Sequence, residues 1–180
     1  GVSVYANSHG FISHKSSSQH SISCSVIGEL EGAMQRDYWY DSNCNASLLQ
    51  TAEEIGIKAA SRTVARLGAR KIASMQTPVL LDPSISKSLI SHLIGALKGG
   101  AIYKKASFML DKIGQPILPD FITVAENPHL LGGANSSMYD GEGVATPSYR
   151  AIVDQGVLQA YVLGSYTARK LSLQSTANSG

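Results

Sequence analysis

The sequence predicts an α+β protein in which mainly antiparallel strands flank a helical middle. Apolar and polar residues alternate with period two over residues 1–41, as in strands that bury one face. The apolar spacing changes to that of a helix over residues 51–67 and 82–98. Strand-like runs return after residue 119, so strands are expected on both sides of the helices.

Residues 1–41 are rich in Ser, Val, Ile and Tyr and predict a meander of antiparallel strands. Cys24 alternates with Ile22 and Val26 on the apolar face of one strand, which indicates a buried free thiol. Cys24 and Cys44 form no spacing motif for zinc or a disulfide scaffold. Their pattern favours a reducing compartment, and we expect a cytoplasmic protein.

The first predicted helix covers Thr51–Leu67. Thr51 and Glu54 have the spacing of a capping box, and Gly68 is placed to end the helix. The residues expected to face inward are Ala52, Ile55, Ala59, Ala60, Val64 and Leu67.

The second predicted helix covers Asp82–Lys98, with Asp82 as cap and Pro83 in the first turn. Gly99 and Gly100 are expected to supply a left-handed stop. Its apolar stripe consists of Ile85, Leu89, Leu93 and Ala96.

The remaining elements are shorter, and a long glycine-rich loop at Asn127–Pro147 separates them. We expect strands at Thr77–Leu81 and Pro119–Ala125, helical turns within Ala106–Ile113, a hairpin of Arg150–Val153 with Val157–Leu163, and a last helix from a Ser165 cap through Leu173.

Two domains are expected. Residues 1–75 would end an N-terminal α+β domain, and residues 76–180 would begin a C-terminal domain. The chain has no initiator Met and opens directly on an alternating run, so we expect a fragment of a longer two-domain protein.

The amino-acid composition of the chain argues against some classes of function. A charged fraction of 16% is low, which favours a large buried surface or a partner interface. A net charge of +2 gives little support for binding nucleic acid or an anionic membrane. No apolar run approaches the length of a membrane span, so no membrane association is expected.

The segment Asp82–Lys105, DPSISKSLISHLIGALKGGAIYKK, resembles the central helix of the TldD/PmbA family. In the TldD branch this helix carries a His-Glu-x-x-x-His core that holds a catalytic metal. When the segments are aligned, the three motif positions are Ser91, His92 and Ala96, so none of the motif residues is present. The segment Asp140–Gly180, with its D-x-EGV, GVLQxY and SYxARKL runs, resembles the PmbA (TldE) branch, which lacks the metal motif.

This resemblance implies a non-catalytic partner subunit of a TldD-type metalloprotease that acts on unfolded or flexible peptides, in peptide maturation and antitoxin degradation. Zinc is then expected in the TldD-type partner, with no cofactor in this subunit, and a homodimer is an alternative assembly. Two other hypotheses stay open: a stand-alone hydrolase with a displaced site, and a gyrase- or DNA-associated regulator.

No catalytic residue is assigned, because His92 is the one ligand-type residue left in the degenerate motif. Three residues are candidates for contact with peptide or partner: His129, Asp140 and Glu142. Asp140 and Glu142 resemble a carboxylate pair, but hydrogen bonds within the loop are the more frequent role for such residues.

Overall fold

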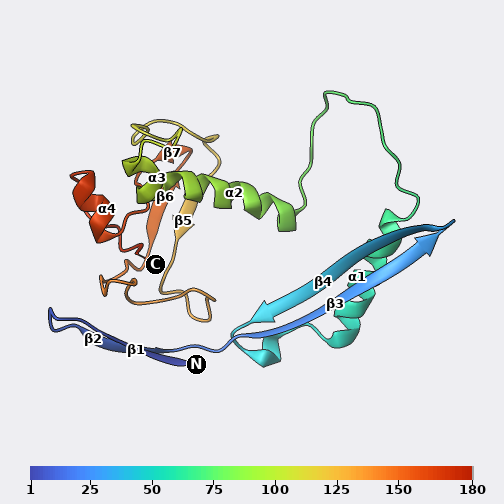
Figure 1. Cartoon of the computed structure of the whole chain (residues 1–180), viewed down its shortest axis with the longest axis horizontal. Coiled ribbons are helices and arrows are strands. Elements are labelled where there is room, and N and C mark those ends of the chain that lie inside the picture. The colour runs from blue at the N-terminus through green and yellow to red at the C-terminus, as the bar shows by residue number, and fades with distance from the viewer. Residues whose placement is uncertain (180) are drawn as a thin grey trace. The chain divides into compact units, whose positions relative to one another are not determined.

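The structure, a computed structural model, describes residues 1–179 and confirms the mixed α+β class with antiparallel strands (Figure 1). Contacts divide the chain into two compact units. The first contains residues 1–2 and 16–78, and the second contains residues 3–15 together with the chain from Val79 onward. The segment 3–15, which the sequence analysis assigned to the first domain, therefore groups with the second unit.

The first four strands form two separate two-stranded sheets, so the expected single meander is wrong. β1 (Val2–Ala6) pairs with β2 (Ile12–Ser16), and β3 (His20–Leu30) pairs antiparallel with β4 (Ala33–Asn43). A two-residue turn joins β3 to β4, and both of its residues, Glu31 and Gly32, have positive φ angles. Such turns match the twist of paired strands.

A short 3-10 helix, η1 (Ala46–Leu48), leads into α1 (Ala52–Arg66), which packs on β3 and β4. The capping box is confirmed, because the Glu54 N–H donates to Thr51 Oγ1 and the Thr51 N–H donates to Glu54 Oε2. The buried residues are Ile55, Ala59 and Thr63.

Thr63 is buried in α1, although the sequence pattern predicted that only apolar residues of this helix would face inward. Val64 is 65% exposed, and Ala52 is also exposed, so the expectation that both face inward is wrong. Thr63 can be buried because its hydroxyl donates to the Ala59 carbonyl at 2.9 Å, which leaves no unpaired donor. The absence of a side chain at Gly28 of β3 lets α1 pack close to this strand, because a Cβ there would lie 3.3 Å from Thr63 Cγ2.

In the second unit, α2 (Pro83–Leu97) begins as predicted, with the Ser84 N–H donating to Asp82 Oδ1 at 2.8 Å. The expected left-handed stop is wrong: Lys98 is extended, and α3 (Gly99–Tyr103) starts at once. Gly99 is needed for a different reason, since a Cβ there would collide with the side chains of Thr167 and Leu163.

The second unit also contains a three-stranded antiparallel sheet of β5 (Val124–Glu126), β6 (Arg150–Asp154) and β7 (Val157–Leu158), followed by α4 (Ser165–Lys170). Gln155 and Gly156 form the β6–β7 turn, both with positive φ.

Three short sequence predictions differ from this arrangement. No strand forms at Thr77–Leu81, residues 106–113 form turns instead of helix, and the strand expected at Pro119–Ala125 is limited to β5. These segments are short, so their local apolar pattern does not distinguish strand, turn and coil.

The core of the second unit lies where the end of α2 and α3 meet the sheet and α4. The buried residues are Leu93, Leu97, Ile102, Ile152, Val153, Leu158, Tyr161, Leu163 and Ala168. The predicted stripe of α2 is buried only in its second half, because Ile85 and Leu89 are more than half exposed. No helix within residues 1–179 combines the length and apolar character needed to cross a membrane.

A pair of neighbouring glycines tests the packing of α3. We expect Gly99→Ala to destabilise the chain by about 1–3 kcal/mol, because the new methyl group overpacks the contact with Thr167 and Leu163. Gly100→Ala is the control, since a Cβ there meets no atom within 4 Å and alanine favours a helix. Denaturant unfolding measures both. Equal stability of the two variants would contradict the close packing at Gly99.

Candidate functional site

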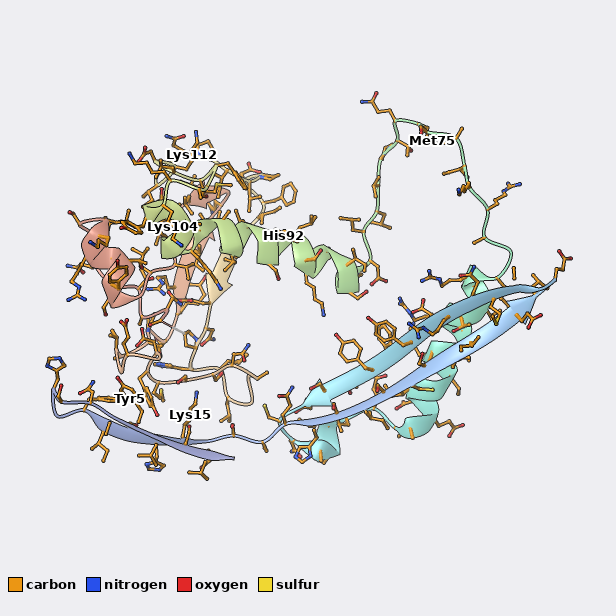
Figure 2. The ribbon with its side chains drawn as sticks, viewed as in Figure 1. Tyr5, Lys15, Met75, His92, Lys104 and Lys112 are labelled. Carbon is orange, nitrogen blue, oxygen red and sulfur yellow. The ribbon has the colours of Figure 1, made fainter. Side chains whose placement is uncertain are left out.

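The three degenerate motif positions lie together on α2, as predicted, and two of the side chains bond back to the helix. Figure 2 shows where His92 lies along this helix. Ser91 Oγ donates to the Lys87 carbonyl at 3.1 Å. His92 Nδ1 lies 2.7 Å from the Ser88 carbonyl, so this nitrogen carries the proton, and the ring is exposed. Ala96 offers only a methyl group.

These residues do not fit a metal centre. Zinc sites in proteins require three or four protein ligands from Cys, His, Asp or Glu. Within residues 1–179, no group of three such residues is arranged to hold a metal ion. His92 therefore belongs to no three-ligand group in the described part of the chain.

Asp140 connects its own loop to the end of the described chain. Its Oδ1 accepts the N–H groups of Glu142 and Val144, each at 2.9 Å, and its Oδ2 accepts the Ser179 N–H at 3.0 Å. Both carboxylate oxygens are thus occupied by backbone donors, which supports a structural role.

Glu142 acts as a cap for a helix that is distant in sequence. Its Oε2 accepts the Ser165 N–H at 2.9 Å, at the start of α4, whose cap position is Gly164. Ser165 is therefore not the capping residue expected from the sequence.

Hydrogen bonds from Ser165, from its side chain and then its backbone, hold the pKa of the Glu142 carboxyl below its ordinary value of 4.5. The positive charge of Arg169 acts in the same direction. The carboxylate is consequently ionised at neutral pH, as a cap at a helix N-terminus favours.

His129 is exposed at the surface of the same loop. Its Nε2 lies 3.1 Å from Thr146 Oγ1, and Thr146 in turn donates to the Ser137 carbonyl. The structure does not bring His129 together with Asp140 and Glu142 as one constellation, because each has separate partners.

A groove of about 840 Å³ lies within the second unit. Its walls come from the β1–β2 hairpin, from the loop between residues 126 and 146, and from residues 177–179. The residues that line it include Ser3, Tyr5, Lys15, Pro128, Leu130, Asn135, Ser137, Tyr139, Asp140, Val162 and Asn178. Tyr5 and Lys15 extend from one side of the hairpin (Figure 2). Asp140 belongs to the lining, whereas Glu142 and His129 do not.

Three aromatic rings fix the hairpin against the loop. Phe11 and Tyr139 meet edge to face with centroids 5.2 Å apart, and Tyr5 lies 5.9 Å from Phe11 and 6.2 Å from Tyr139. Gly143 has a φ of +80°, and a Cβ there would lie 2.9 Å from both Phe11 and Tyr5. The ring cluster therefore requires glycine at this position.

A half-buried charged network contributes to the groove wall, because Glu126 and Asn178 belong to the lining. The Arg150 guanidinium pairs with the Glu126 carboxylate, donates to the Thr176 carbonyl, and donates to Asn178 Oδ1 at 2.7 Å. Asn178 also donates to Glu126 Oε2 at 3.0 Å. Lys15 is different, because its ammonium forms no ion pair within residues 1–179.

Sequence reasoning identified the loop but missed Tyr5, Lys15, Tyr139 and Arg150. The alternation of β1 does place Ser3 and Tyr5 on one face, which is a weak signal. No local pattern could show that Arg150 pairs with Glu126, which lies 24 residues earlier.

Comparisons with known proteins agree along the whole chain. Residues 1–67 match the central domain of PmbA/TldA metallopeptidases, and residues 74–180 match their C-terminal domain. Metalloprotease PmbA from Escherichia coli O157:H7 is 45% identical over 180 residues, which cover all of this chain and 40% of that protein.

Solved structures show the same fold. A protein from Bacteroides thetaiotaomicron, described as a candidate modulator of DNA gyrase, superposes with a TM-score of 0.90 at 34% identity, over 96% of this chain and 39% of that one. TldE from Thermococcus kodakarensis superposes with a TM-score of 0.83 at 20% identity, over 95% of this chain and 38% of that one. The chain thus spans about two fifths of the length of these relatives.

The carboxylate of Glu142 should make stability depend on pH. Its folded-state pKa is depressed, so its stabilisation is present above the unfolded-state value near 4.5 and is lost as the pH falls through the folded value. We expect Glu142→Ala to lower the free energy of unfolding at pH 7 by about 1 kcal/mol, as for loss of a helix cap. Denaturant unfolding between pH 7 and pH 3 should show the difference shrinking below about pH 4.5.

Asp120→Ala is the control for this measurement, because Asp120 is an exposed carboxylate of the same unit whose side chain forms no hydrogen bond within residues 1–179. A deficit at Glu142 that stays constant down to pH 3 would contradict a role for the ionised carboxylate.

Proposed function

This chain belongs to the PmbA/TldD metallopeptidase family, and on that premise we propose that it forms part of a non-catalytic partner subunit of a TldD-type metalloprotease. In this proposal the partner holds the zinc and cleaves the peptide. The present chain contributes binding surface for unfolded or flexible peptides.

The observation that carries the proposal is the identity of the three motif positions on α2. A hydroxyl at Ser91 and a methyl group at Ala96 cannot replace imidazole as zinc ligands. The remaining His92 uses Nδ1 on its own helix, and it belongs to no group of three ligand-type side chains in the described residues. Among the alternatives, a stand-alone hydrolase that uses zinc would therefore need ligands from outside residues 1–179.

The groove supports the proposal that this chain contributes binding surface for flexible peptides. Its wall includes most of the loop Asn127–Gly143, which the sequence analysis considered the candidate for peptide contact. The wall combines apolar side chains such as Leu130 and Pro128 with uncharged polar ones such as Asn135 and Ser137. A surface of this kind suits an extended peptide, whose backbone needs hydrogen bonds and whose side chains vary.

The proposed assembly is a mixed dimer with a TldD-type chain, and a homodimer is the alternative in its absence. The exposed apolar residues of α2, Ile85 and Leu89, are available for such an interface. Cys24 and Cys44 are both free thiols, which is compatible with the proposed cytoplasmic location.

The full-length protein can be tested alone and with a TldD-type chain. Alone, we expect no stoichiometric zinc and no hydrolysis of a flexible peptide, because the motif residues are absent. With the TldD-type chain, light scattering should show a mixed complex and proteolysis should appear. Zinc bound at His92, or proteolysis by the protein alone, would overturn the proposal.

The groove itself can be tested with two adjacent leucines. Leu130 lines the groove, whereas Leu131 does not and is fully exposed. We expect Leu130→Asp to weaken peptide binding about fivefold, because it replaces an apolar contact of about 1 kcal/mol by a hydrated charge. Leu131→Asp should leave the affinity unchanged. Fluorescence anisotropy of a labelled flexible peptide measures both, and equal effects would argue against the groove as the binding site.

A second candidate function comes from the way solved relatives are described. The similar protein from Bacteroides thetaiotaomicron is described as a candidate modulator of DNA gyrase, so association with gyrase is the alternative. A pull-down that compares gyrase with a TldD-type chain separates the two. Retention of gyrase without the TldD-type chain would favour the alternative.

A further inference from the structure

Cationic side chains gather around α3 and α4, and none of them is among the residues that line the groove. The stretches 83–110 and 157–179 contain no Asp or Glu. Around the end of α2, α3 and α4 they carry five cations, which we call the cationic face: Lys98, Lys104, Lys105, Arg169 and Lys170.

Packing brings these residues into one region of the second unit. α3 contacts α4, and the two helices lie side by side in Figure 1. Tyr103 of α3 and Tyr166 of α4 meet edge to face with centroids 6.3 Å apart. Lys170 Nζ lies 5.9 Å from the Tyr103 ring and 5.7 Å from the Tyr166 ring. Lys98 belongs to the same region, because its backbone forms an isolated parallel β-bridge with Val162, shortly before α4.

Most of the charge of this face has no acidic partner: Arg169 acts electrostatically on the Glu142 carboxylate, whereas the other four cations form no ion pair within residues 1–179. The ion pairs within residues 1–179 involve Arg62, Arg66 and Arg150, and none involves a residue of the cationic face. All five side chains are exposed. Like charges held close together without counter-charges raise the local potential and attract anionic groups.

We propose that the cationic face binds an acidic, flexible segment of a substrate polypeptide, outside the groove. Carboxylates on a flexible segment can reach several separated ammonium groups at once, and each exposed pair adds a small increment. Capture at this face would raise the concentration of the same polypeptide at the groove. The proposal rests on the proposed function only in taking flexible peptides as the natural ligands.

The aromatic residues favour a polypeptide over a nucleic acid. Single-stranded nucleic acids bind through free aromatic faces on which bases stack. Here Tyr103 and Tyr166 contact each other, and the Lys170 ammonium lies against both rings. The two tyrosine rings therefore position the Lys170 ammonium group. The face presents positive charge to a ligand instead of a free aromatic surface.

The test measures binding of labelled decaglutamate to the full-length protein by fluorescence anisotropy. We expect binding at low ionic strength that weakens as salt is added, because exposed charges are screened. Lys104→Glu with Lys170→Glu should reduce the affinity about tenfold, since it replaces two attractive charges by repulsive ones. Arg70→Glu with Lys71→Glu is the control: it changes the net charge equally at two exposed residues outside the face. This control should retain the affinity.

Thermal unfolding establishes that each variant is folded, and Lys98→Glu with Lys104→Glu replaces the first pair if loss of Lys170 unfolds the chain. Lys104→Glu with Lys170→Glu should leave the groove's affinity for an uncharged flexible peptide unchanged, because neither residue lines the groove, so failure at the groove and failure at the cationic face are distinguishable. Three results would overturn the proposal: no binding of decaglutamate, equal loss in the test and control pairs, or tighter binding of oligodeoxythymidine than of decaglutamate.

Discussion

The second unit depends on three charged side chains that tie its irregular segments together. Asp140, Glu142 and Arg150 bind the loop before β6, the start of α4 and residues 176–179. The loop from Asn127 to Pro147 contains no helix or strand, so its backbone groups need partners from elsewhere. Hydrogen bonds to charged groups contribute about 1.5–3 kcal/mol each, more than neutral ones, which suits a segment without regular structure.

This constraint explains why the groove has a defined shape. The carboxylates fix the loop from one side, and the ring cluster of Tyr5, Phe11 and Tyr139 fixes the hairpin from the other. Both groups of contacts meet at residues 140–143, where Asp140 accepts the Val144 N–H and Gly143 leaves space for the rings. The acidic residues that resemble a catalytic pair therefore have structural roles: Asp140 holds the loop that lines the groove, and Glu142 caps α4.

The central helix shows how a family scaffold is kept while its metal ligands are absent. α2 retains its cap and its buried end at Leu93 and Leu97, so the helix does not need a metal to form. The side chains of Ser91 and His92 form hydrogen bonds with backbone carbonyl groups one turn earlier in α2. Ser91, His92 and Ala96 are thus ordinary positions of a partly exposed helix, and the positive charge of the unit gathers beyond its end.

The sequence by itself determined what depends on neighbours a few residues apart. Thr51 and Glu54 predicted a capping box, Asp82 and Pro83 predicted the start of α2, and the motif positions predicted the family branch. The tertiary structure decided which residues form contacts with segments that are distant in the sequence. Glu142 caps a helix 23 residues away, Asp140 holds Ser179 at a separation of 39 residues, and Gly99 is required by Thr167 instead of by a turn. Local patterns report backbone preferences, whereas these contacts exist only after the chain has folded and brought unrelated segments together.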